Sequence, residues 1–526
     1  MKEPAKDTGL IARSAGKVSG AVMCSRILGL VREQVFAFLF GAGFAYDAFV
    51  VAFRIPNLLR DLFGEGALSA AFVTVFSDYD TNRDKEQTMR LAGNVIIFFL
   101  ILLSIITLLG IWQAENIVRL MVEAEFENVP GKVELTRLMT MIMFPFLILI
   151  SMSSVCMGIL NSRGYFFVPS LASSFFNMGS IVGGVGLALL MPAIGQPAIV
   201  GMALGTLIGG GLQLVGQFPS LRKAGFVFRP ALDLSDPGLR RILKLMVPAV
   251  AGLAALQLNI FINSFFASSL QEGSLSWLNY AFRLFMFPLG VFGVAISIAA
   301  HPVMARQAAS GSMDALKESY VSTLTMGFSL TIPAAAGLIM LAEPVIRLIF
   351  QYGRFDPYST TMTGEALAYY ALGLAAYASV KVTAPVFYNI NETRYPVLGS
   401  FLAVGVNVLV VLLAIDHLQH RALALSISCA MTVNFLFLFT ILHCKLKGFS
   451  LSYLFQGFFK VVLATAVMVL WLYGMGGFMA GGGVFRNLIE VVVQVGSGAL
   501  VYGVALYFLK LPELRMMVES FRSRMR

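Results

Sequence analysis

Apolar stretches of about twenty residues recur along the whole chain, and short polar segments separate them. The stretch 92–113, AGNVIIFFLILLSIITLLGIWQ, contains no charged residue, and a helix needs about 20 apolar residues to cross a bilayer. Counting such stretches gives fourteen candidate spans. The pattern therefore predicts an all-α polytopic membrane protein with 14 transmembrane helices.

Composition supports this class. Charged residues make up 13% of the 526 residues, about half the usual share of roughly 25% in soluble domains. The polar N-terminal stretch is not followed by a short apolar core and a small-residue cleavage site, so we expect the first span to act as the insertion signal.

Positive charges concentrate in alternate connections between the predicted spans. The richest connection follows the sixth span, whereas the one after the third span is acidic. These clusters are Arg222, Lys223, Arg229, Arg240, Arg241 and Lys244 in the first case, and Glu115, Glu123, Glu125 and Glu127 in the second. Because Lys and Arg mark cytoplasmic loops, we expect both termini in the cytoplasm. The net charge of +10 thus reflects topology and indicates no nucleic-acid partner.

Two segments of the chain resemble each other. AFRIPNLLRDLFGEGALSAA (52–71) and AFRLFMFPLGVFGVAISIAA (281–300) share seven of twenty residues at an offset of 229. Asn177 and Asn407, each in a predicted span, are 230 residues apart. A repeated unit of six helices keeps its orientation, so it predicts two lobes related by a pseudo-two-fold axis along the membrane normal. The expected division is 1–225, 226–448 and, for two extra helices and the tail, 449–526.

Charged side chains lie inside three of the predicted spans. Each costs roughly 2.5–3.5 kcal/mol at the bilayer centre, so packing alone does not explain them. They are Arg26 and Arg32 in the first span, Arg54, Arg60, Asp61 and Glu65 in the second, and Arg283 in the eighth. The arginines outnumber the acids, and the planar guanidinium suits phosphate. The surplus favours an anionic substrate, although snorkelling to the bilayer surface stays an alternative, above all for Arg26.

Proline and glycine in the same spans indicate irregular helices. Pro56 in the second span and Pro288 in the eighth are expected to bend them. Bent helices suit alternating access. Glycines in the same spans would permit bending, and dense helix packing explains these glycines equally well.

Several longer motifs carry a family resemblance. They are SRILGLVRE, FGAGFAYDAFVVAFRIPNLLRDLFGEGALSAAFV, LNYAFRLFMFPLGVFGVAI and LIFQYGRF. Over essentially its whole length the chain resembles the MurJ (MviN-type) lipid II flippases of the multidrug/oligosaccharidyl-lipid/polysaccharide exporter superfamily. The resemblance implies a bacterial inner-membrane protein that moves lipid II, the undecaprenyl-pyrophosphate-linked peptidoglycan precursor, to the outer leaflet.

The resemblance also implies roles for individual residues. Substrate-binding arginines match Arg26, Arg32, Arg54, Arg60 and Arg283, and acidic residues of the family match Asp47 and Glu65. Within the spans themselves, Asp61 and Glu65 are candidate counter-ions, so we expect Asp47, Asp61 and Glu65 to act as charge partners or gating residues. Some relatives bind sodium through carboxylates in two spans, where this chain has Asn263 and Asn407. We expect no bound cofactor, and coupling to membrane potential, protons or sodium. Expected partners are lipid II, membrane lipids and the cell-wall synthesis machinery.

Two other classes of function remain. An O-antigen-type flippase carries a similar pyrophosphate-linked cargo, and a drug or cation exporter of the same superfamily shares the expected fold. The surplus of arginine disfavours a cationic cargo. An enzyme is disfavoured because no phosphate-binding glycine loop, nucleophile elbow or zinc motif is present in the sequence.

Overall fold

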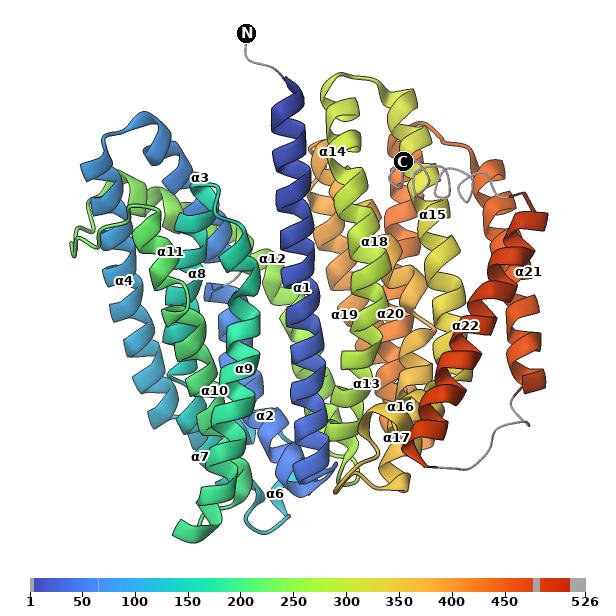
Figure 1. The fold of residues 1–526 in the computed structure, drawn as a ribbon, viewed down its shortest axis with the longest axis horizontal. Helices are drawn as coiled ribbons and strands as arrows, with labels where there is room; N and C mark the ends of the chain where they lie inside the picture. Colours follow the sequence, from blue (N-terminus) through green and yellow to red (C-terminus); the bar gives the residue numbers. More distant parts are fainter. Residues whose placement is uncertain (1–3, 65, 476–482, 511–526) are drawn as a thin grey trace. The chain divides into compact units, whose positions relative to one another are not determined.

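The computed structural model describes residues 4–64, 66–475 and 483–510, which lie almost entirely in helices (Figure 1). The described residues contain no strand, so the predicted all-α class is confirmed. Contacts within the chain divide it into two compact units, Met1–Gly273 and Ser274–Arg526. The helix over residues 237–268, which we predicted to be the first helix of the second lobe, belongs to the first unit by its contacts. The predicted division at residues 225/226 stays a prediction.

Each unit is a bundle of long helices joined by short connections. The elements of the first unit are α1 (Pro4–Phe40), α2 (Phe44–Leu59), η1 (Arg60–Gly64), α3 (Ala67–Asn82), α4 (Lys85–Trp112), α5 (Ala114–Met121), α6 (Ala124–Glu127), α7 (Lys132–Met143), α8 (Phe146–Ser162), α9 (Phe167–Leu190), η2 (Met191–Ile194), α10 (Ala198–Val215), α11 (Phe218–Lys223) and α12 (Pro237–Ser268). Those of the second are α13 (Ser274–Pro288), η3 (Leu289–Val294), α14 (Ala295–Ala309), α15 (Met313–Met340), α16 (Ala342–Phe350), α17 (Pro357–Ala371), α18 (Leu374–Asn389), α19 (Arg394–Leu418), α20 (His420–Lys445), α21 (Leu451–Met475) and α22 (Val484–Phe508).

Many of these helices have the length and composition of membrane spans. Ten helical segments of the described residues qualify, and α17 with α18, which meet at an angle of 43°, would make eleven. The chain is therefore a multi-pass membrane protein. Three more segments, α1, the run from α2 to α3 and α12, are each long enough for a crossing. The predicted total of fourteen depends on them and stays a prediction.

Apolar side chains of α3, α4, α8 and α12 form the main core of the first unit. Phe72, Phe76, Phe99 and Ile159 are fully buried in this cluster. On another side of the unit, α9 and α10 approach each other through glycines. A Cβ atom at Gly205 would lie 2.4 Å from the Cα of Gly184. Such close approach is how helices pack in lipid, where apolar burial alone gives no driving force.

The second unit packs α14, α15, α18 and α20 around a similar apolar core. The two last helices, α21 and α22, pack against each other and against α15. The hydroxyl of Tyr502 on α22 donates to the carbonyl of Ser329 on α15 at 2.6 Å. The chain's C-terminal helices are thus attached to the second unit by both apolar and polar contacts.

The repeated segments both contain a π-helical turn. In the first, η1 covers Arg60–Gly64, shortly after Pro56. In the second, η3 covers Leu289–Val294, directly after Pro288. The sequence offset of 229 carries residues 60–64 onto 289–293, so the two π turns lie at equivalent positions. The prediction that these two helices are irregular is confirmed.

The α9–α10 contact generates a test of helix packing. We expect Gly205→Ala to lower the melting temperature of the purified protein, because the added methyl group meets backbone atoms of Gly184. Overpacking of this kind costs about 1–3 kcal/mol. Thermal unfolding followed by fluorescence in detergent measures it.

Gly211 on the same helix provides the control. A Cβ atom there meets nothing within 4 Å, so Gly211→Ala is expected to leave stability unchanged or raise it slightly through better helix propensity. Equal melting temperatures for the two variants would contradict the packing account.

Candidate functional site

Arg32 lies on α1 beside a buried carboxylate. Its Nη2 atom donates to Oε1 of Glu33 at 2.9 Å, and its guanidinium lies 5.2 Å from the ring centroid of Phe176 on α9. The side chain of Glu33 is only 3% exposed, and its Oε2 atom accepts a hydrogen bond of 2.6 Å from the Tyr46 hydroxyl on α2. The Nε atom of Arg32 is buried without a hydrogen-bond partner among the described residues. The guanidinium is therefore fixed in place and keeps a donor for an anion.

Arg60 lies at the start of η1 and is paired in the same way. Its Nε and Nη2 atoms donate to Oδ1 of Asp61 at 3.1 and 2.8 Å. The second carboxylate oxygen of Asp61 accepts from Nε2 of Gln257 on α12 at 3.1 Å. The side chains of Arg60 and Asp61 are 25% and 28% exposed, so the pair remains accessible. The acid partly compensates the cost of placing an arginine in a membrane span.

The other three predicted arginines lie on α1, α2 and α13. Arg26 on α1 and Arg54 on α2 are half-buried, whereas Arg283 on α13 is exposed, six residues before η3. Arg26 makes no ion pair with any described residue. Glu65 lies outside the described residues. Four of the five predicted arginines thus belong to the first unit and Arg283 belongs to the second.

The second unit adds a lysine that the sequence reasoning missed. Lys381 lies on α18, and its Nζ atom is 5.9 Å from the ring centroid of Tyr377. Its backbone carbonyl accepts a hydrogen bond of 2.7 Å from the Ser297 hydroxyl on α14. In addition, η3 packs on α18 where Gly293 meets Ala378. These contacts join the helix of Lys381 to the bent helix that carries Arg283.

Asp47 has a structural environment unlike that of Asp61. It lies in the first turn of α2 and is 2% exposed. Its Oδ2 atom accepts from Nζ of Lys132 on α7 at 3.3 Å and from the backbone N–H of Gly273 at 2.8 Å. Gly273 has a φ of 98°, which residues with a side chain rarely adopt. Asp47 therefore ties α2, α7 and the end of the segment after α12 together.

A second carboxylate strengthens this tie. Oε1 of Glu272 accepts a hydrogen bond of 2.9 Å from the backbone N–H of Phe44, at the start of α2. The Lys132 ammonium also lies 4.6 Å from the ring centroid of Phe126. We name the set Phe44, Asp47, Lys132, Glu272 and Gly273 the α2 clasp. Asp47 is thus paired with Lys132, and its predicted role as a charge partner of the arginines stays a prediction.

The two asparagines predicted for ion coupling lie in different units. Asn263 is on α12, and both of its amide heteroatoms are buried without a hydrogen-bond partner among the described residues. Asn407 is on α19 and is 1% exposed. No group of three or more His, Cys, Asp or Glu side chains in the described part of the chain is arranged to hold a metal ion. An ion-coupling role for either asparagine stays a prediction.

The sequence alone indicates only some of the charged residues that the prediction missed. Lys381 is the single charged residue between Glu365 and Glu392, so a search for isolated charges in apolar spans would have found it. Glu33 directly follows Arg32 and was detectable as its neighbour. Lys132 borders an acidic connection, and nothing in the local sequence indicates that it pairs with Asp47.

The fold is that of a polytopic α-helical membrane protein, and it is similar to the folds of solved membrane transporters. A solved inward-facing multidrug resistance MATE family transporter of the MOP superfamily is similar over 80% of this chain and 94% of its own, with a TM-score of 0.67 and 18% identity, which is a likeness of fold alone. A solved lipid II flippase MurJ in an inward closed conformation is similar over 93% of this chain and 97% of its own, with a TM-score of 0.75 and 26% identity.

Sequence comparison then gives the family. The family model of lipid II flippase MurJ matches residues 36–493. A probable lipid II flippase MurJ from Buchnera aphidicola subsp. Schizaphis graminum (strain Sg) is 33% identical over 518 residues, which covers 98% of this chain and 100% of the relative. The chain belongs to the MurJ lipid II flippase family, a family of transporters, and the resemblance predicted from the sequence motifs is confirmed.

The α2 clasp generates a stability test. We expect Asp47→Asn to lower the free energy of unfolding, because it leaves the Lys132 ammonium buried without its counter-charge. Breaking one side of a buried pair costs about 3–5 kcal/mol. Thermal unfolding of the purified protein measures the loss.

The double variant Asp47→Asn, Lys132→Met separates charge from contact. It removes both charges, so it is expected to recover much of the stability that Asp47→Asn loses. A double variant as unstable as the single one would show that the bond from Gly273 carries the effect and that the ion pair does not.

Proposed function

We propose that this chain translocates lipid II from the inner to the outer leaflet of the bacterial cytoplasmic membrane by alternating access. Its relatives are described as lipid II flippases. The observation that carries the proposal is a guanidinium inside a span, that of Arg32, which is held by Glu33 and Phe176 and retains a buried unpartnered donor. The pyrophosphate of lipid II matches such donors in charge and geometry.

The proposed binding step is an exchange of ion-pair partners. In the absence of substrate, the carboxylates of Glu33 and Asp61 neutralise Arg32 and Arg60. The pyrophosphate carries more charge than one carboxylate and offers more acceptor oxygens, so it competes for the guanidinium groups. Tyr46 and Gln257 continue to hydrogen-bond the carboxylates that are displaced. Arg26, Arg54 and Arg283 are proposed to contribute further positive charge along the route.

The conformational step is proposed to use the two π turns. Such turns are frequent at functional sites, and kinks in helices arise at prolines and π turns. In this chain η1 follows Pro56 and η3 follows Pro288. Bending at these points would change the exposure of Arg60 and Arg283, which lie within or near them.

The setting of the protein belongs to the same proposal. The basic connections support a topology with both termini in the cytoplasm. Lipid II is then taken up from the inner leaflet, where basic residues gather. The enzymes that polymerise the precursor on the outer side are proposed as functional neighbours.

The first test is complementation of a bacterium depleted of its own lipid II flippase. Expression of this chain is expected to restore growth, whereas Arg60→Ala and Arg283→Ala are expected to cause lysis, because each removes a cation that meets the pyrophosphate. Lys381→Ala is expected to slow growth for the same reason. Lipid II accumulation in the inner leaflet, measured by protease or antibiotic accessibility, reports transport directly.

Arg119→Ala is the matched control. Arg119 lies on the short helix α5 and is paired with Glu115 and Glu127 at the surface, where such pairs contribute at most about 1 kcal/mol. It should complement like the unchanged chain. Lysis with the unchanged chain, despite confirmed insertion, would instead favour another polyprenyl-linked cargo of the O-antigen type.

We propose the membrane potential as the driving force. Moving one anionic charge to the positive outer side gains about 2.3 kcal/mol per 100 mV. The positions where some relatives place carboxylates are occupied here by the neutral amides of Asn263 and Asn407. Collapse of the potential by valinomycin with potassium is expected to stop lipid II transport, while replacement of sodium by choline leaves it unchanged. Transport that stops without sodium, at constant potential, would refute this proposal.

A further inference from the structure

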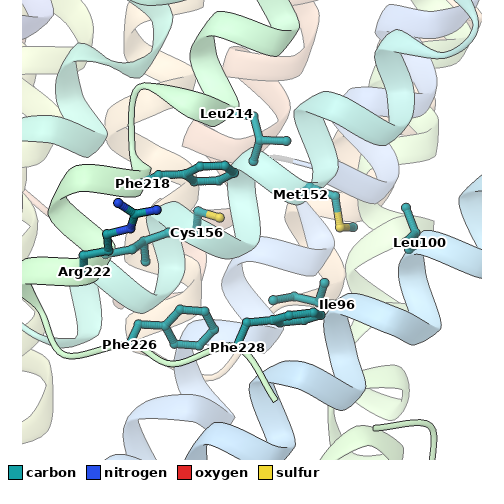
Figure 2. A pocket seen from close by; sticks show the side chains of 10 residues that line it. Ile96, Leu100, Met152, Cys156, Leu214, Phe218, Arg222, Phe226 and Phe228 are labelled. Atoms are coloured by element: carbon teal, nitrogen blue, oxygen red, sulfur yellow. The ribbon is translucent and has the colours of Figure 1, made fainter. Parts of the chain in front are cut away.

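The first unit contains an apolar cavity of about 420 Å³ whose lining includes none of the residues of the candidate functional site (Figure 2). This volume is within the range of roughly 300–1,000 Å³ for small-molecule sites. The lining comes from α4, α8, α10, α11 and the segment after α11. The lining residues are Ile96, Leu100, Met152, Cys156, Leu214, Phe218, Leu221, Arg222, Phe226 and Phe228.

The cavity is elongated and charged at one end only. Figure 2 shows Arg222 at one end beside Phe218, and Leu100 at the opposite end, with the rings of Phe226 and Phe228 along one side. Arg222 is the single charged residue of the lining. It is exposed and makes no ion pair with any described residue. Leu100, Phe218 and Phe228 are 39%, 40% and 48% exposed, so the cavity is open to the surroundings of the protein.

The wall formed by Phe226 and Phe228 is fixed to α4. A Cβ atom at Gly93 would lie 1.7 Å from the carbonyl oxygen of Arg229, so only a glycine allows the segment to lie this close to the helix. Further along, the side-chain amide of Asn94 donates to the carbonyl of Asp233 and accepts from its N–H, both at 2.8 Å. The segment that carries the aromatic wall is thus held against α4.

More positive charge lies near the Arg222 end. Lys223 follows Arg222 in the sequence and is exposed. The Nζ atom of Lys85 would lie 3.9 Å from a Cβ atom at Gly225, which is in the turn between α11 and the aromatic wall. A ligand with an apolar tail in the cavity would therefore place its head group among three basic residues.

We propose that this cavity binds one acyl chain of an anionic glycerophospholipid, with the lipid phosphate at Arg222. The charge complementarity selects the head group, and the aromatic wall holds the chain. The proposal does not depend on lipid II transport, because none of these residues belongs to the proposed substrate route.

The preference for an anionic over a neutral phospholipid is expected to come from Arg222. An acyl chain gains little on moving from the bilayer into an equally apolar cavity, since lipid tails already surround it there. A basic residue near the membrane surface, in contrast, attracts an anionic lipid by about fivefold in affinity, the factor that corresponds to about 1 kcal/mol per charge. Phosphatidylglycerol should therefore bind more tightly than phosphatidylcholine, whose head group is neutral overall.

The first experiment is native mass spectrometry of the purified full-length chain with dioleoyl phosphatidylglycerol or dioleoyl phosphatidylcholine. We expect tighter binding of phosphatidylglycerol, and we expect Arg222→Ala to weaken it about fivefold while Arg222→Lys retains it. Arg119→Ala, at the surface of α5 and outside the lining of the cavity, is the matched control and should leave binding unchanged. Equal affinity for the two lipids, or equal losses in Arg222→Ala and Arg119→Ala, would overturn the proposal.

The second experiment locates the lipid. Phosphatidylglycerol with a photoactivatable acyl chain is crosslinked to the unchanged chain, and the labelled peptides are identified. Labels on Ile96–Leu100, Met152–Cys156 or Phe226–Phe228 support the site, and labels confined to other helices overturn it. Full competition by undecaprenyl pyrophosphate at this site would also overturn it, because the cavity would then serve the transported lipid. This measurement stays decisive if Arg222→Ala proves unstable.

Discussion

The cost of placing charge inside a bilayer is the constraint on which the structure of this chain depends. Each arginine or lysine in a span costs a few kcal/mol. Carboxylates pair with such residues in α1 and in the run from α2 to α3, which we predict to be spans, and at the start of α7. Arg32 has Glu33, Arg60 has Asp61, and Lys132 has Asp47. In each pair the carboxylate accepts a further hydrogen bond, from Tyr46, Gln257 or Gly273. These additional hydrogen bonds fix the orientation of the three carboxylates.

The way in which the helices pack is also determined by the lipid environment. Because lipid tails are as apolar as leucine, helices associate by close contact and hydrogen bonds. The approach of Gly205 to Gly184 and the bond from Tyr502 to Ser329 are examples from the two units. The π turns η1 and η3 are the places where the helices of the repeat depart from regular α-helical geometry.

The sequence predicted those features that arise from local pattern. Apolar length predicted the spans, and Pro56 and Pro288 predicted irregular helices at equivalent positions of a repeat. Features that arise from tertiary contact were not accessible. Asp47 and Lys132 are 85 residues apart, and the motif around Asp47 suggested a role beside the arginines. The grouping of α12 with the first unit likewise depends on contacts, such as the bond from Gln257 to Asp61, that no periodicity encodes.

The geometry of the ion pairs separates those suited to exchange from those suited to hold the fold. Arg32 with Glu33 and Arg60 with Asp61 are neighbours in sequence, so each of these ion pairs lies within one helical segment. In the proposed exchange, an incoming anion takes the place of the carboxylate. Asp47, in contrast, connects α2 with α7 and with Gly273, and it is 2% exposed. Opening that pair would remove the link between α2 and α7, while the bond from Gly273 separately connects α2 to the segment after α12. Ion pairs within one helical segment suit the exchange proposed for Arg32 and Arg60, whereas the pair of Asp47 with Lys132 suits a contact that holds segments together.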